Sequence, residues 1–366
     1  MRSIHCFFVL VFCLTFFCFP VQAAEADLYG QLDTESLWDA LPEETKSILL
    51  DSNMQPDSMQ DASVPTWLSA LSGAVSDELY APFKTGARLI ALILLARIIR
   101  DFGDGSLNHA VQVGAVFAAA VLLVKPISAL IEQTEQMIGI LSAVLTASIP
   151  VYAGILVLSG HAVTGSTYGA LTLSWGSGIA AVSRQLLLPL TRIYFVFSIV
   201  TSVSDIGLKQ IADALYRSVK WLLILGITIF TGILSLQTLL SAQTDLAAAK
   251  AAKMVASGAV PIVGGAFSDA LSILGTSVGL VKSGVGAFGL LASLTIFLPI
   301  CLKAGAWIAI QTAAAFAADL LEMPCLSDLL TGCVSVLKML IAVLCSVGLI
   351  SLVAAAVLLC VRSAYG

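Results

Sequence analysis

The sequence predicts an all-α, polytopic integral membrane protein with about six to eight transmembrane helices after a cleaved signal peptide. Hydrophobic residues make up 58% of the 366-residue chain and charged residues only 11%, whereas soluble domains carry about 25% charged residues. Apolar runs of spanning length recur along the second part of the chain. The formal net charge is −5, and no basic run could follow a phosphate backbone. A nucleic-acid-binding protein is therefore excluded.

Residues 1–23 have the three-part pattern of a cleaved secretory signal. Arg2 gives a positive start, an apolar run of 14 residues extends from Cys6 to Phe19, and Val21-Gln22-Ala23 precedes the predicted cleavage site. Fourteen residues are too few to cross about 30 Å of hydrocarbon as a helix. An uncleaved N-terminal anchor is the alternative.

Residues 24–83 form an acidic segment that export would place outside the cytoplasm. They hold 12 Asp and Glu against one base, Lys46, a net charge of −11, while the predicted transmembrane domain, residues 84–366, has a net charge of +5. Asp33-Thr34-Glu35 and Pro42-Glu43-Glu44 are typical helix starts and predict two short helices. The segment is too short and polar to bury its own core. We expect it to lie against a partner or the membrane surface, or to be a semi-ordered acidic leader.

The transmembrane domain contains strong and weak candidate spans. The strong spans are 84–100, 109–124, 138–158, 186–203, 219–240, 284–302 and 334–361, and the weaker ones are 162–182, 258–281 and 304–320. With the mature N-terminus outside, the positive-inside rule puts Arg97 and Arg100 in the cytoplasm. It puts a loop with Glu132 and Glu135 outside, and an acidic turn with Glu322 outside as well.

Two apolar segments are interrupted by proline and glycine in the same way. Residues 148–154 read Ser-Ile-Pro-Val-Tyr-Ala-Gly, and residues 259–265 read Ala-Val-Pro-Ile-Val-Gly-Gly. Proline removes a backbone hydrogen bond and glycine tolerates a bend, and paired broken helices indicate a transport path at a repeat interface. The candidate pore or hinge residues are Pro150, Gly154, Pro261, Gly264 and Gly265. A chance match of low-complexity sequence is the alternative.

The candidate partner-binding residues follow the fourth strong span. Over residues 205–220 the apolar side chains fall on one helical face, and Lys209, Asp213 and Arg217 fall on the other. Asp213 and Arg217 have the i, i+4 spacing of a favourable ion pair. The pattern predicts a helix in the membrane interface or a docking surface for a partner. Lys250 and Lys253 are further candidate interface residues.

No pattern indicates catalysis, a cofactor or a metal site. The P-loop, His-Glu-x-x-His and Gly-x-Ser-x-Gly motifs are absent, and the three histidines are isolated. We therefore predict no catalytic, cofactor-binding or metal-binding residue and expect that the protein is not an enzyme. Residues 284–289 match Gly-x-Gly-x-x-Gly but open a membrane span, and no acid follows before Asp319. This pattern is interpreted as helix packing through small residues.

The order of the segments in the transmembrane domain and its Gly/Ala-rich composition give the chain a family resemblance. The local match comprises Leu236-Gln237-Thr238, Lys250-Ala251-Ala252-Lys253, residues 260–265 and Ser268-Asp269-Ala270. Together with the signal peptide, the acidic leader and the Gly/Ala-rich polytopic body, it resembles the stage III sporulation protein AE family of endospore-forming bacteria. The resemblance covers roughly residues 84–366 and brings no catalytic residue.

The resemblance implies a multi-pass protein of the cell membrane, located in the mother-cell (outer forespore) membrane during sporulation. It implies a membrane subunit of a multiprotein channel or export apparatus that links mother cell and forespore and is required for spore development. The implied partners are the other membrane proteins of the stage III sporulation operon, a secretion-type ATPase and membrane lipid. The residues alone leave two alternatives open, a stand-alone permease for a small solute and a purely structural membrane scaffold.

Overall fold

A computed structural model describes residues 34–56, 59, 62–102, 105–159, 161–203, 210–230, 232–233 and 264–360. Regular secondary structure in these ranges is entirely helical. The predicted all-α fold is therefore confirmed for this part of the chain. The predicted signal peptide, residues 1–23, lies outside the described residues.

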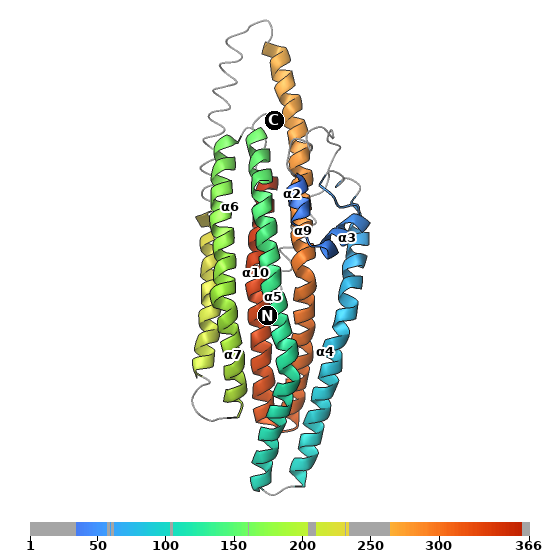
Figure 1. The fold of residues 1–366 in the computed structure, drawn as a ribbon, viewed down its shortest axis with the longest axis vertical. Helices are drawn as coiled ribbons and strands as arrows, with labels where there is room; N and C mark the ends of the chain where they lie inside the picture. Colours follow the sequence, from blue (N-terminus) through green and yellow to red (C-terminus); the bar gives the residue numbers. More distant parts are fainter. Residues whose placement is uncertain are drawn as a thin grey trace.

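The described helices form an elongated bundle. In chain order they are α2 (Thr34–Asp39), α3 (Glu43–Asp51), α4 (Val64–Asp101), α5 (Gly105–Leu158), α6 (Ala162–Val182), the π-helical turn η3 (Ser183–Leu187), α7 (Leu188–Thr201), α9 (Gly264–Leu320) and α10 (Pro324–Cys360). Residues 210–230 form a further helix between α7 and α9. The long helices run side by side along the longest axis, and the short helices α2 and α3 lie against them (Figure 1).

Two of these helices are far longer than a bilayer is thick. α5 has 54 residues and α9 has 57, so each is about 80 Å long, against about 30 Å of hydrocarbon. Pro126 and Pro150 lie inside α5, and Pro299 lies inside α9, without ending either helix. Ending a helix in an apolar environment leaves several backbone groups without partners. That cost exceeds the loss of the single hydrogen bond that each proline removes.

Within the described residues, four helices are long and apolar enough to cross a membrane: Asn108–Leu158, Ala162–Thr201, Ser283–Leu320 and Pro324–Ala356. These helices support the prediction of a membrane protein, but the described part of the chain does not reach the predicted six to eight spans. Part of the difference arises because neighbouring predicted spans join into single helices, and the predicted spans 219–240 and 258–281 lie partly outside the described residues. The joined pairs are 109–124 with 138–158 in α5, 162–182 with 186–203 in the helix Ala162–Thr201, and 284–302 with 304–320 in α9.

The prediction of an external loop with Glu132 and Glu135 is wrong, because both residues lie within α5. The membrane orientation predicted from the sequence treats the residues of α5 as two crossings. It therefore places Arg100 and Glu322 on opposite sides of the membrane. In the structure these two side chains are ion-paired, with Nη2 and Oε2 2.9 Å apart. The predicted placement of Arg100 and Glu322 on opposite sides of the membrane is therefore also wrong. Counting α5 as one pass brings both residues to the same end of the bundle.

The two short helices predicted in the acidic segment are present as α2 and α3. Leu37 of α2 and Leu49 of α3 are fully buried. α2 packs on α5, and α3 packs on α4 and α9, so this part of the segment lies on the chain's own bundle. The predicted domain boundary after residue 83 falls inside α4, which begins at Val64.

Residues 210–230 form one helix that passes through the predicted interfacial segment 205–220. Val219, on the predicted apolar face, is buried. Tyr216 packs on Tyr194 of α7, with ring centroids 6.2 Å apart. This helix therefore packs on the bundle and does not end at residue 220.

Candidate functional site

A seam between α5, α9 and α10 is covered by the short helix α2. Leu37 of α2 is 1% exposed, and Trp38 beside it packs on Phe288 of α9, with ring centroids 6.0 Å apart. A helix of six residues is not stable by itself in water. Burial of a leucine contributes about 1.5–3 kcal/mol, so these two side chains hold α2 on the bundle.

The seam encloses a cavity of about 10 Å³, whose wall includes Leu37, Ser148, Tyr152, Gly289 and Ser351. A single water molecule needs at least about 10–15 Å³. The hydroxyl of Ser148 donates to the carbonyl oxygen of Leu145 at 2.7 Å, and the buried hydroxyl of Ser351 has no partner among the described residues. The cavity holds one water at most, so the seam is closed to solutes in this conformation.

Glycines bring the helices of the seam into close contact. A Cβ atom on Gly289 would overlap the Tyr152 hydroxyl, and one on Gly286 would lie 2.8 Å from the Leu359 side chain. Both glycines belong to the run 284–289. These contacts confirm that the Gly-x-Gly-x-x-Gly pattern packs helices in this protein.

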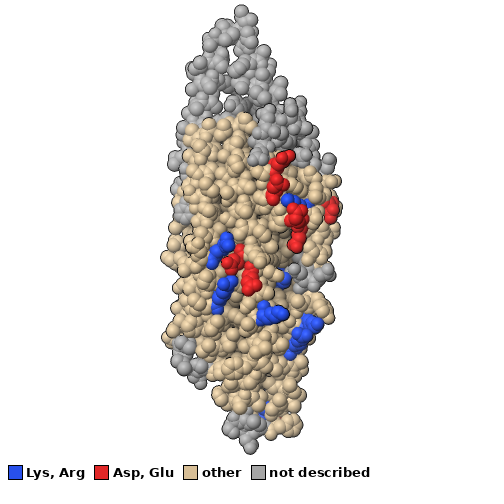
Figure 2. Space-filling model, viewed as in Figure 1, with Lys and Arg blue, Asp and Glu red and all other residues tan. Residues whose placement is uncertain are grey.

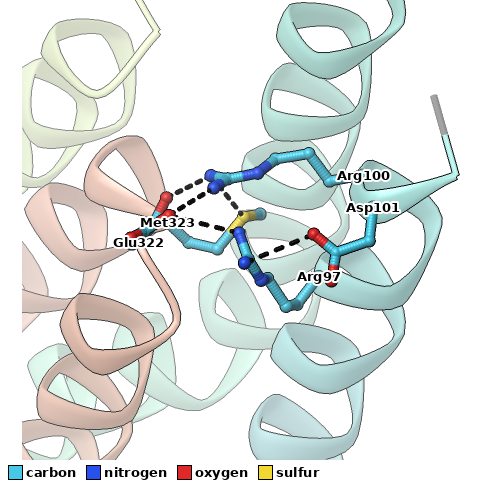
Figure 3. A network of polar contacts seen from close by, with 5 residues as sticks. All are labelled: Arg97, Arg100, Asp101, Glu322 and Met323. Atoms are coloured by element: carbon cyan, nitrogen blue, oxygen red, sulfur yellow. Dashed lines mark hydrogen bonds and ion pairs between the residues drawn. The ribbon is translucent and has the colours of Figure 1, made fainter. Parts of the chain in front are cut away.

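A second polar arrangement joins the end of α4 to the turn between α9 and α10 (Figure 3). Arg100 and Arg97 of α4 reach Oε2 of Glu322 at 2.9 Å and 3.4 Å, and Arg97 also reaches Oδ1 of Asp101 at 3.3 Å. Arg100 donates a further hydrogen bond to the backbone carbonyl of Glu322. Glu322 has a φ of 55°, a conformation in which L-residues are uncommon. The two arginines therefore fix a tight turn, and we name this arrangement the arginine clamp.

Basic and acidic side chains also gather about halfway along the bundle (Figure 2). Arg192 of α7 pairs with Glu135 of α5, with Nη2 and Oε2 2.9 Å apart. Arg192 is the charge that the sequence places deepest within a predicted span. Its partner lies 57 residues away along the chain, which is why no local pattern reveals the pair.

Comparison with known protein families decides the identity of the chain. The sequence model of the family described as stage III sporulation protein AE matches residues 48–361. The chain belongs to the stage III sporulation protein AE family. This confirms the resemblance and gives the protein a role in spore development.

A curated relative in the stage III sporulation protein AE family is that of Bacillus subtilis (strain 168). It is 24% identical to this chain over 228 residues, which are 61% of this chain and 57% of the relative. The match thus spans little more than half the length of the curated relative. No solved structure matches the chain.

The stage III sporulation protein AE match begins inside α3 and extends to the end of α10. It includes the three long helices of the seam and the whole arginine clamp. The covering helix α2 lies before it. The helices that build the seam are thus the part of the chain that the family defines.

The structure places the candidate hinge residues of this family member in different settings. Pro150 lies on the exposed side of an uninterrupted α5, and Gly154 is half-buried one turn further on. Gly264 and Gly265 are the first residues of α9, and Pro261 lies outside the described residues. A role of these positions in a pore stays a prediction.

The candidate interface residues are only partly described. Asp213 and Arg217 are exposed on the helix 210–230, and Nε of Arg217 donates to the backbone carbonyl of Asp213 at 3.2 Å. Lys209, Lys250 and Lys253 lie outside the described residues. Among the described residues, no group of three or more His, Cys, Asp or Glu side chains could hold a metal ion.

Proposed function

We propose that this stage III sporulation protein AE family member is a membrane subunit of a multiprotein channel or export apparatus that joins mother cell and forespore. It acts in the mother-cell (outer forespore) membrane. Family membership and the apolar long helices support a sporulation role within a membrane. Membership of a multiprotein assembly is what the resemblance to this family implies.

The closed seam is the observation that supports a need for partners. Its cavity of about 10 Å³ admits no solute, so a path along it would require α2 or a neighbouring helix to move. The sequence has no P-loop of its own, so a separate secretion-type ATPase would supply the energy. The other membrane proteins of the operon would form the remaining wall of this path. The subunit itself catalyses no reaction.

Deleting the gene in a spore-forming host tests the proposal. Time-lapse microscopy should show normal vegetative growth and complete engulfment, followed by forespores that shrink and fail. A copy of the gene restored at another locus is the control and should rescue spore formation. Normal sporulation together with a growth defect on one nutrient would contradict the proposal and favour a small-solute permease.

Transport by the purified protein separates the same two functions in vitro. Reconstituted alone into vesicles, a channel subunit should pass no more small solute than empty vesicles do. Solute-specific uptake by the protein alone would favour the permease.

Cysteine accessibility distinguishes a pore from a scaffold. Ser148 is 3% exposed, so Ser148→Cys should not react with a water-soluble maleimide in the isolated protein. It should react in sporulating cells if the assembly opens the seam. Glu44→Cys on α3 is the positive control, because this position is exposed. Protection of Ser148→Cys under both conditions would favour a scaffold.

A further inference from the structure

A polar pocket lies where α5 meets the junction of α6 and η3. Its volume is about 350 Å³, and it is lined by Glu135, Ser142, Ser177, Ala180, Ala181, Arg184 and Gln185. It is separate from the seam, and none of these residues contributes to the arginine clamp. Glu135, which lines the pocket, is the residue that pairs with Arg192 of α7.

The spacing of residues on the two helices builds this pocket. Glu135, Gly139 and Ser142 are four and three residues apart, so they share one face of α5. Because Gly139 has no side chain, the Arg184 guanidinium can lie close to α5, with Nη1 3.7 Å from where a Cβ atom would be. The π-helical turn begins at Ser183, immediately before Arg184. Such turns occur frequently at functional sites.

The pocket is lined by one acidic and one basic side chain, Glu135 and Arg184, and they are not paired with each other. Glu135 is already paired with Arg192 at 2.9 Å. Arg184 makes no hydrogen bond or ion pair with any residue that the structure describes, and the same holds for the Ser142 hydroxyl and the Gln185 amide. A guanidinium, an amide and a hydroxyl thus remain available to one ligand.

We propose that this pocket binds the phosphate group of an anionic phospholipid. A guanidinium presents paired N–H donors that match two phosphate oxygens, and the Gln185 amide and Ser142 hydroxyl add neutral donors. Val182 and Leu186 beside them are 47% and 45% exposed, which provides an apolar surface for the acyl chains. The proposal needs the chain to lie in a membrane, but it does not depend on the assembly proposed above.

Native mass spectrometry of the full-length protein in mild detergent tests this site. Equal amounts of phosphatidylglycerol and phosphatidylcholine are added, and the bound lipids are compared. The wild type should retain phosphatidylglycerol preferentially, and Arg184→Gln should reduce this preference about tenfold, as expected for a lost charged hydrogen bond. Arg184→Lys should give an intermediate value, because lysine keeps the charge without the planar fork.

Arg88→Gln is the matched control. Arg88 is an exposed arginine of α4 that does not line the pocket, so this variant should bind lipid like the wild type. Equal retention of both lipids by the wild type, or an equal loss in Arg184→Gln and Arg88→Gln, overturns the proposal. Displacement of phosphatidylglycerol by an equal concentration of glycerol phosphate would assign the pocket to a free phosphate and overturn the lipid assignment. Lipid-free thermal melting shows whether Arg184→Gln is folded.

Discussion

Replacement of Gly332 by alanine should weaken the contact between α7 and α10. A Cβ atom at this position would overlap the Ser198 hydroxyl and lie 2.8 Å from the Ser198 Cβ. The hydroxyl can rotate away, but the Cβ cannot, so the two helices must separate. Overpacking of this kind costs about 1–3 kcal/mol, while alanine gains about 1 kcal/mol over glycine in a helix. The net expectation is a loss of about 1 kcal/mol in the free energy of unfolding.

Gly305→Ala on α9 is the matched control, because a Cβ atom there would have no neighbour within 4 Å. It should leave the protein as stable as the wild type or stabilise it by up to about 1 kcal/mol. Thermal unfolding of the detergent-solubilised variants measures both effects. Adding Ser198→Gly to Gly332→Ala removes the obstructing Cβ, so the double variant should be more stable than the sum of the single changes predicts. Additive changes, or a Gly332→Ala variant as stable as Gly305→Ala, would refute the reasoning.

Three further contacts give separate predictions. Tyr168→Phe removes a buried hydrogen bond from the Tyr168 hydroxyl to the carbonyl of Ala354, 3.1 Å long, and should cost about 1 kcal/mol; an unchanged melting temperature would contradict this. Leu37→Asp buries a carboxylate in the seam and should release α2, so that protease cleaves the acidic segment faster while the melting temperature of the bundle is kept; unchanged protection would show that other contacts hold α2. Arg100→Ala should cost about 1 kcal/mol, because Glu322 is largely exposed, and should remove part of the salt dependence of stability; an identical salt dependence in the variant and the wild type would argue against the arginine clamp.

Local patterns predict the elements of this fold well. The acidic helix starts at Thr34 and Glu43 and the apolar run over 84–100 correspond to α2, α3 and the second half of α4. The packing role of residues 284–289 also follows from the sequence, because small residues in an apolar segment let backbones approach. In each case the sequence pattern that predicts the element lies within a few residues along the chain.

The continuity of α5 could not be predicted in this way. Charged residues within a membrane segment are costly, so Glu132 and Glu135 indicate a loop when only neighbouring residues are considered. In the structure Arg192 of α7 supplies the compensating charge for Glu135. The polar pocket has the same origin, because Arg184 and Gly139 meet only after α6 has folded back on α5. Interactions between residues distant in sequence thus accompany both the continuity of α5 and the formation of this pocket.

The length of α5 bears on the proposed assembly. From Asn108 to Glu132, and again from Glu135 to Leu158, α5 rises about 35 Å, and each half alone could cross about 30 Å of hydrocarbon. Both halves carry apolar side chains on the outside of the bundle, such as Val121, which is 76% exposed, and Val157, which is 48% exposed. A single bilayer covers only one of these halves. Exposed apolar surface on the other half is costly in water, so we expect protein partners to cover it, as a subunit of a larger apparatus requires.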